Sequence, residues 1–181
     1  MDTYLRVLVF VAVGWLALVL LICGARLRGN AIGNPPIAWP ALALAKLGLA
    51  IPIVLLIRYA AQGSSPTSAW NALGAAGLLI GGCAIVTAGL SALGTNLRLG
   101  LPEPPTSLVT SGIYRVSRNP IYVGVYFYLG ASLVVAFSWL NFCAVLTAVV
   151  LHHWIILAEE HFLEEKFRDY EKYRRCVRRY F

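Results

Sequence analysis

The stretch NPIYVGVYFYLGASLVVAFSWLNFCAVLTAVVLHHWIILA, residues 119 to 158, contains no charged residue. Its 40 residues are about twice the number that an α-helix needs to cross a hydrocarbon core of ~30 Å. The polar break SWLN, residues 138 to 141, divides the stretch near its middle. We therefore predict two membrane-spanning helices joined by a tight hairpin.

Two further segments are apolar enough to span a membrane. The 19 residues VLVFVAVGWLALVLLICGA, at positions 7 to 25, lie between two arginines and are long enough for one crossing. The segment from about residue 71 to 93 is also apolar, and it is rich in Gly and Ala. Small residues of this kind let neighbouring helices approach closely. We predict one span from each segment.

A less regular candidate runs from about residue 37 to 57, because it contains Pro40, Lys46 and Pro52. A proline is tolerated within a helix bundle, where neighbouring helices satisfy the freed carbonyl. The chain is 59% hydrophobic and only 13% charged, with a mean hydropathy of +0.73, whereas ordinary soluble domains carry ~25% charged residues. The expected fold is an all-α, polytopic membrane helix bundle of about five transmembrane helices, followed by a C-terminal cytoplasmic amphipathic helix.

The basic residues predict the orientation. Of the 15 Lys and Arg residues, 12 fall on one side of this topology, only Arg6 and Arg58 fall on the other, and Lys46 lies inside a span. Because basic residues favour the cytoplasmic side, we expect the N-terminus outside and the C-terminus inside. MDTYLR has no net basic charge, so the first span is not expected to be a cleaved signal. The net charge of +7 suits an anionic inner leaflet and does not call for nucleic acid.

Several kinds of chemistry have no support in the sequence. The four cysteines are scattered, and no pair has metal-binding or redox spacing. There is no phosphate-binding loop, no nucleophile elbow and no pair of metal-ligating histidines on one helix. We therefore expect no metal and no hydrolytic or nucleotide-triphosphatase activity.

The densest polar sequence is SGIYRVSRNPIYVG, residues 111 to 124. It ends a proline-containing cytoplasmic loop, residues 95 to 119, that should follow an extended path. Pro120 is expected at the first helical position and Asn119 at the N-cap. Arg118, Asn119 and the positive end of a helix would then converge, which suits a carboxylate or phosphate. The alternative is a simple helix cap with Arg115 and Arg118 among lipid phosphates.

A second polar region begins at the end of the fifth predicted span. His153 precedes Glu160 by seven residues, so the two lie within ~20° of one helical face, and Glu164 lies one turn further. Ionisable groups at this depth in a membrane suggest function. The alternative is a set of interfacial charges, with His152 and His153 as hydrogen-bonding residues facing the bundle.

GIYRVSRNPIYVG, followed about 35 residues later by EEHFLEEKFRDYEKY, resembles the isoprenylcysteine carboxyl methyltransferase and phospholipid methyltransferase superfamily of integral membrane enzymes. The resemblance covers about residues 90 to 180, including ALG at residues 92 to 94. Isoprenylcysteine enzymes usually carry His where this chain has Asn119, whereas Arg-Asn-Pro occurs in bacterial and phospholipid-type relatives. The resemblance therefore implies the fold and the cofactor, S-adenosylmethionine, more strongly than an isoprenylcysteine substrate.

The resemblance also implies cofactor-site residues, which are Gly112, Tyr114, Arg118, Asn119, Pro120, Tyr122, Gly124, Glu159 and Glu160. Arg118 and the helix N-terminus would bind the cofactor carboxylate, and Glu159 or Glu160 its ammonium or ribose hydroxyls. Tyr114 and Tyr122 would line the sulfonium or adenine. We favour Glu160 as the cofactor partner and, with Arg118, as catalytic, and we expect Glu159 to pair with Arg98 or Arg115.

These inferences predict residues 1 to 69 as two N-terminal transmembrane helices and residues 70 to 181 as the methyltransferase core. The site would face the cytoplasm in a multi-pass protein of a bacterial inner membrane. A lipophilic acceptor would enter from the bilayer, and a carboxylate, amine, thiol or phenol is compatible with the visible residues. The alternative function is a non-enzymatic membrane scaffold or small transporter whose basic tail binds anionic lipids.

Overall fold

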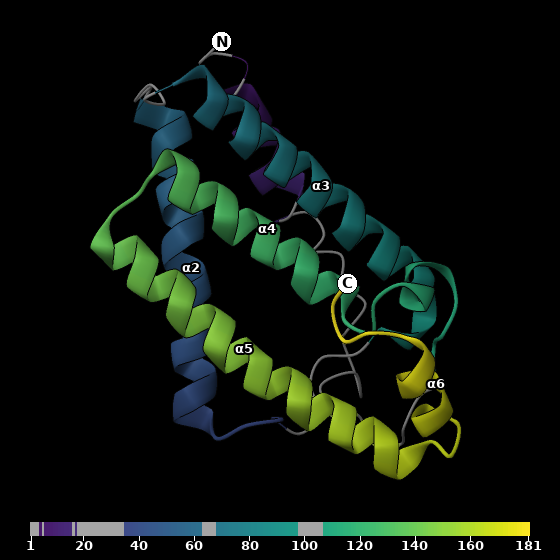
Figure 1. The fold of residues 1–181 in the computed structure, drawn as a ribbon. Helices are drawn as coiled ribbons and strands as arrows, with labels where there is room; N and C mark the ends of the chain where they lie inside the picture. Colours follow the sequence, from purple (N-terminus) through teal and green to yellow (C-terminus); the bar gives the residue numbers. More distant parts are fainter. Residues whose placement is uncertain (1–3, 5, 16, 18–34, 63–67, 98–106) are drawn as a thin grey trace.

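The computed structural model describes residues 4, 6–15, 17, 35–62, 68–97 and 107–181 (Figure 1). The main helices are α2 (Trp39–Gln62), α3 (Ala69–Leu93), α4 (Pro120–Val135) and α5 (Trp139–Lys166). Shorter elements are the apolar helix Arg6–Trp15, two 3-10 turns, η1 (Gly94–Asn96) and η2 (Gly112–Arg115), and α6 (Tyr170–Cys176). The described residues contain no named strand, so the prediction of an all-α helical membrane bundle is confirmed.

The lengths of these helices can be compared with the five predicted spans. Helices α2, α3 and α5 are long and apolar enough to cross a membrane. Helix α4, the fourth predicted span, is apolar but has only 16 residues, fewer than the ~20 of a typical crossing. The first predicted span is described only over its beginning, and most of residues 16 to 25 lie outside the described part of the chain.

The hairpin between α4 and α5 lies at the predicted polar break. Ser138 is the N-cap of α5, and its hydroxyl accepts a hydrogen bond from the Asn141 backbone N–H at 3.1 Å. The buried Asn141 side chain donates to the carbonyls of Ser132 and Ala136 at 3.1 and 3.0 Å. The Ser132 carbonyl also accepts from the Ala136 N–H at 2.8 Å, whereas the Ala136 carbonyl lies at the helix end, where carbonyls lack intrahelical partners. Asn141 therefore satisfies the end of α4 and joins the two helices.

Helices α3 and α4 lie side by side and touch through glycine (Figure 1). A Cβ atom built on Gly124 would stand 2.5 Å from Cγ2 of Val86 in α3. One built on Gly82 would stand 2.9 Å from the carbonyl oxygen of Gly124. The backbones are therefore close enough to exclude even a methyl group, as the Gly-rich sequence of the third predicted span suggested.

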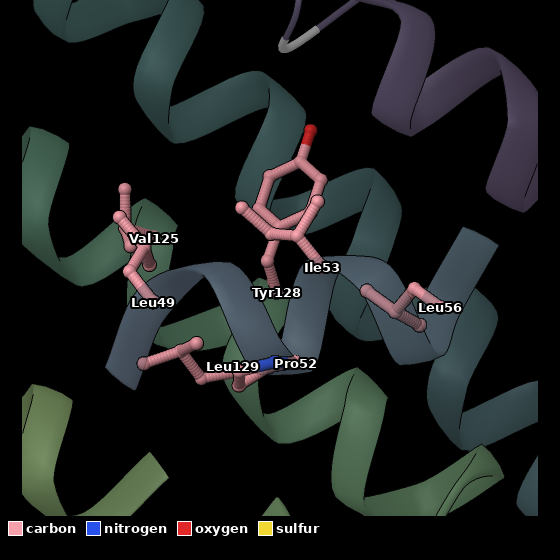
Figure 2. A pocket seen from close by; sticks show the side chains of 7 residues that line it. All are labelled: Leu49, Pro52, Ile53, Leu56, Val125, Tyr128 and Leu129. Atoms are coloured by element: carbon pink, nitrogen blue, oxygen red, sulfur yellow. The ribbon is translucent and has the colours of Figure 1, made fainter. Parts of the chain in front are cut away.

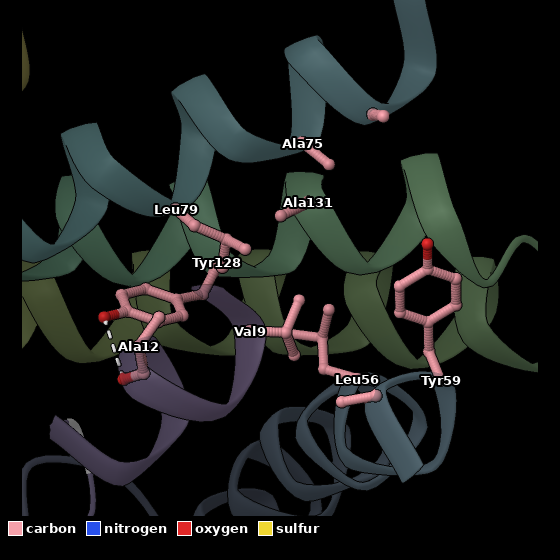
Figure 3. Close-up of a cluster of buried hydrophobic side chains, with 10 residues drawn as sticks. Val9, Ala12, Leu56, Tyr59, Ala75, Leu79, Tyr128 and Ala131 are labelled. Atoms are coloured by element: carbon pink, nitrogen blue, oxygen red, sulfur yellow. Dashed lines mark hydrogen bonds between the residues drawn. The ribbon is translucent and has the colours of Figure 1, made fainter. Parts of the chain in front are cut away.

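Helix α2 packs mainly against α5 and also contacts α4. A Cβ atom on Gly48 would lie 2.9 Å from the Ala144 carbonyl oxygen, so this contact is also made by backbone. Pro52 lies inside α2 and is buried. Figure 3 shows the apolar cluster that α2 shares with the N-terminal helix, α3 and α4, where the Tyr128 hydroxyl donates to the Ala12 carbonyl at 3.4 Å.

Exposed tryptophans lie where α3 and α5 begin, at the same end of the bundle in Figure 1. Trp70 is 81% exposed and Trp139 is 74% exposed. Tryptophan concentrates at the boundary between hydrocarbon and water, so this end of the bundle fits one membrane interface. The loop that precedes α4 and the short helix α6 lie at the opposite end.

Candidate active site

The polar sequence before α4 folds as a 3-10 turn followed by a bend. Gly112 begins η2 with φ at +60°, a conformation that favours glycine, and a Cβ there would stand 3.3 Å from that of Ala92 in α3. Ser117 is fully buried, and its hydroxyl accepts a hydrogen bond from the Asn119 N–H at 3.1 Å. Pro120 then begins α4, as the sequence predicted.

Asn119 occupies the N-cap position of α4, but its side chain does not cap the helix. Its amide group instead donates to Oε1 of Glu160 at 2.9 Å and to the Arg179 carbonyl at 3.3 Å. The predicted N-cap position is therefore confirmed, but the side chain does not cap the helix, because Glu160 provides a charged and buried acceptor for it.

Four residues form a charged group around the buried Glu160 carboxylate, here called the Glu160 cluster: Arg118, Asn119, Glu160 and Arg179. Arg118 donates from Nε to Oε1 of Glu160 at 3.2 Å and from a terminal nitrogen to Oε2 at 3.0 Å. Arg179 donates to Oε2 from two nitrogens, at 3.1 and 3.0 Å. The side chains of Arg118 and Glu160 are each only 8% exposed. The Glu160 carboxylate thus accepts five N–H groups and is saturated.

Residues 177 to 180, here called the C-terminal segment, lie along the residues that precede α4. Ser117 and Arg178 form an isolated parallel bridge, and the Arg118 N–H donates to the Arg178 carbonyl at 2.9 Å. The Arg118 guanidinium also donates to the Val177 carbonyl at 2.7 Å. Figure 1 shows the C-terminus beside the start of α4. Two distant parts of the chain are therefore joined by both backbone and side-chain bonds.

The predicted stripe of His153, Glu160 and Glu164 is present on α5, and the end of the chain covers it. His153 and the Tyr180 hydroxyl are 2.6 Å apart, and Arg174 donates to Glu164 at 2.8 Å. With Arg179 on Glu160, each residue of the stripe has a partner from residues 174 to 180. The stripe therefore binds the end of this chain in the structure.

Tyrosines attach α6 to the η2 turn. The Tyr173 hydroxyl donates to the Tyr114 carbonyl at 2.6 Å, and Tyr114 is itself buried. Burial raises the pKa of Tyr173 to about 12 and also raises the pKa of Tyr114. Both phenols therefore stay neutral at physiological pH, and α6 is held over the turn that carries Tyr114.

A second polar group lies deeper in the bundle. The Tyr122 hydroxyl is 3.1 Å from both carboxylate oxygens of Glu159 and donates to them. The ring of His152 lies 6.0 Å from that of Tyr122, and its Nδ1 is 2.7 Å from the Ala148 carbonyl. Glu159 thus accepts from one phenol, unlike the saturated Glu160.

This arrangement corrects the pairing expected for Glu159. Among the described residues its hydrogen-bond partner is Tyr122 rather than Arg115, and Arg98 lies outside them. Adjacent glutamates on a helix point ~100° apart, which explains why they reach different surroundings. Gly124 also differs from its expected place, because it faces α3 as a packing residue.

Four residues of this region were not predicted from the sequence: Ser117, Tyr173, Arg179 and Tyr180. The two residues of the C-terminal segment belong to a basic tail that resembles any lipid-binding tail, so the sequence carries no separate signal for them. In the described part of the chain, no group of three or more His, Cys, Asp or Glu residues could hold a metal ion.

Comparison with known proteins places this geometry in a family. A family model described as phospholipid methyltransferase matches residues 70–170, which include all but the first residue of α3, the whole of α4 and α5, and both glutamates. The match covers more than half of the chain, and the chain belongs to this family of membrane methyltransferases. Searches of curated proteins and of solved structures each found no match.

Proposed function

We propose that the chain is an S-adenosylmethionine-dependent methyltransferase that modifies a lipophilic acceptor from the bilayer. Membership in the phospholipid methyltransferase family supports the reaction class. The observation that carries the proposal is the partly exposed Tyr122–Glu159 pair at the cytoplasmic end predicted for the bundle. The cofactor would supply an electrophilic methyl group on a sulfonium sulfur.

The Tyr122–Glu159 pair fits the positively charged part of such a cofactor. Glu159 supplies a carboxylate with unused acceptor capacity, and Tyr122 supplies an aromatic face beside it. The buried Tyr114 is close enough for Glu159 to act on its phenol electrostatically. These three residues would hold a sulfonium or ammonium group and exclude water from it.

The Glu160 cluster fits a different role. Its carboxylate is saturated, and Arg118 uses its guanidinium on Glu160 and on the carbonyls of Arg174 and Val177. We therefore assign Arg118 and Glu160 to positioning the loop and the C-terminal segment that wall the site. This assignment exchanges the roles that the sequence analysis favoured for the two glutamates.

Methyl transfer itself demands alignment. A lone pair of the acceptor forms a bond to the methyl carbon while the carbon–sulfur bond breaks and leaves its electrons on sulfur. Holding the acceptor and the methyl group in the right orientation lowers the activation barrier by several kcal/mol. A base is needed only where the acceptor arrives protonated, and Glu159 is then the nearest carboxylate that is not already saturated.

Calorimetry of the purified protein in lipid nanodiscs with S-adenosylmethionine tests the proposal. We expect Glu159→Gln to weaken binding at least ~10-fold, about 1.4 kcal/mol, with little change in thermal stability. Tyr122→Phe should weaken binding by roughly 1 to 2 kcal/mol, because it removes a hydrogen bond to a charged group.

Glu165→Gln is the matched control, since Glu165 is exposed and pairs with His161 on the surface of α5. If wild type binds no S-adenosylmethionine, the enzymatic proposal fails, and the result favours the alternative function of a membrane scaffold or small transporter. If Glu160→Gln keeps its stability and alone loses the cofactor, the two glutamates have the roles that the sequence analysis gave them.

A further inference from the structure

Lys46 lies inside α2, about two turns after its start at Trp39, where a charged residue is costly. Its neighbour Ala45 is buried against Leu151 and Ile155 of α5, and Tyr122 packs against the same cluster. Lys46 is therefore at the depth of the Tyr122–Glu159 pair. Its side chain is exposed, and it makes no hydrogen bond or ion pair with the described residues.

The charge of Lys46 reaches the candidate site. It lies close enough to act electrostatically on both Glu159 and His152 of α5. Glu159 already accepts from Tyr122. The Lys46 ammonium group can therefore form an ion pair with a further ligand. An anionic group on that ligand would give the strongest interaction, because charges attract more strongly where water is scarce.

An apolar cavity lies directly beyond these polar groups. It measures about 80 Å³ and is lined by Leu49, Pro52, Ile53, Leu56, Val125, Tyr128 and Leu129. Leu49 follows Lys46 by three residues and Val125 follows Tyr122 by three, so the cavity begins one turn deeper in both helices. Figure 2 shows Leu49 and Val125 together at one end and Leu56 at the other. The space admits a short piece of hydrocarbon chain.

We propose that Lys46 and this cavity between α2 and α4 form the binding site for the methyl acceptor, an amphiphile whose head carries an oxyanion. This inference rests on the proposed function. Lys46 binds a carboxylate or phosphate oxygen of the head, and the cavity takes the first carbons of the tail. The remaining tail extends into the bilayer. The head then lies beside Tyr122 and Glu159, where a methyl donor would be held.

The arrangement assigns opposite charges to neighbouring positions. Glu159 attracts the cationic donor, and Lys46 attracts the anionic acceptor, so each ligand favours the other. Lys46 also lies outside residues 70–170, the part matched by the family model. Under this proposal, the N-terminal part of the chain contributes a residue that determines acceptor specificity.

Photocrosslinking in nanodiscs of uncharged lipid tests the site without knowledge of the natural acceptor. The probes are four dodecyl chains with a diazirine near the head, ending in a carboxylate, a phosphate, a hydroxyl or a trimethylammonium group. We expect the carboxylate or the phosphate probe to label α2 and α4 around the cavity, as located by mass spectrometry. Stronger labelling by one of these two probes shows whether the site binds a carboxylate head or a phosphate head.

Lys46→Met should reduce labelling by the anionic probe at least ~10-fold and leave the hydroxyl probe unchanged. Lys46→Arg, which keeps the charge, should retain most of the labelling. Lys172→Met is the control, because Lys172 is an exposed lysine of α6. Val125→Phe, which fills the cavity, should reduce labelling by all four probes.

Equal labelling by all four heads, or anionic labelling that survives Lys46→Met, overturns the inference. Calorimetry with S-adenosylmethionine on the same samples separates this result from the proposed function. Wild type is expected to bind both the anionic probe and the cofactor. A wild type that binds the anionic probe and no cofactor refutes the methyltransferase proposal and leaves a lipid-binding site.

Discussion

Arg118 and Arg179 each donate a hydrogen bond of 3.0 Å to the same carboxylate oxygen, Oε2 of Glu160. One arginine precedes α4 and the other belongs to the C-terminal segment. The shared oxygen therefore joins a residue inside the region matched by the family model, residues 70–170, to a residue beyond the end of that region. This relationship predicts how the site responds to substitution.

The Glu160 cluster should behave as one cooperative unit. We expect Arg118→Ala to lower the free energy of unfolding by ~3 to 5 kcal/mol, because it leaves the buried Glu160 carboxylate without a main partner. Glu160→Gln in the same background should add little further loss. Thermal unfolding in detergent across the double-mutant cycle measures this coupling. Arg174→Ala is the control, because its ion pair with Glu164 is half exposed and should cost less than ~1 kcal/mol.

The glycine contact between α3 and α4 should tolerate no side chain. We expect Gly124→Ala to destabilise the protein by ~1 to 3 kcal/mol, since its Cβ would stand 2.5 Å from Val86. Gly77→Ala in α3 is the matched control, because nothing lies within 4 Å of a Cβ there. Alanine should stabilise that helix slightly. Similar melting temperatures for the two variants would contradict the close backbone contact.

Alkaline pH should detach α6 from the η2 turn. The folded-state pKa of Tyr173, about 12, lies above the ordinary value of ~10. The neutral phenol therefore contributes its full stability below pH ~10, and this contribution is lost as the pH rises through about 12. Protection factors for amide hydrogen exchange in the Tyr114 region, which are corrected for the intrinsic rise of exchange with pH, should fall over this range. Tyr173→Phe removes the bond to the Tyr114 carbonyl and should lower these protection factors to a value that no longer changes between pH ~10 and ~12.

The orientation of the bundle stays a prediction and can be measured with single cysteines. Cys176 is exposed in α6, and Ser138→Cys places a thiol in the exposed turn between α4 and α5. With the other cysteines replaced by alanine, a membrane-impermeant maleimide should label position 138 in intact cells. It should label Cys176 only after permeabilisation. The reverse pattern would place the candidate site outside the cytoplasm.

Hydrophobic patterning was sufficient to predict α2, α3, α4 and α5. The charge-free run before Glu159 predicted the α4–α5 hairpin, because two crossings need about that many apolar residues and SWLN has the polar residues of a cap. Glycine content predicted the closeness of α3 to its neighbour without identifying α4 as that neighbour. Sequence periodicity fixes which residues share a face, but it does not specify the partner of that face.

The site could be predicted only in part for the same reason. Arg118, Asn119 and Glu160 were all predicted as cofactor-site residues, because the helix start and the acidic helix end were expected at one membrane surface. The structure brings the three side chains into contact, and their role stays a prediction. The additional hydrogen bonds from Arg179 to the Glu160 carboxylate could not be predicted, because they depend on a long-range backbone bridge between Ser117 and Arg178. The separate surroundings of Glu159 likewise depend on which face of α5 meets Tyr122.

Pro52 and Gly48 divide α2 into two mechanically different halves. The part near Gly48 is fixed on α5 by backbone contact, whereas Pro52, one turn further, lacks the N–H that would bond to the carbonyl four residues earlier. Bending of α2 should therefore concentrate at Pro52, which is also part of the cavity wall. A ligand that needs more room than the cavity offers would gain it by tilting the outer half of α2, while the α3–α4 pair stays rigid. The outer half of α2 is also held, because Leu56 packs in the apolar cluster and Arg6 donates to the Ala60 carbonyl at 2.8 Å. Entry of the acceptor would then combine a hinge motion at Pro52 with movement of these contacts.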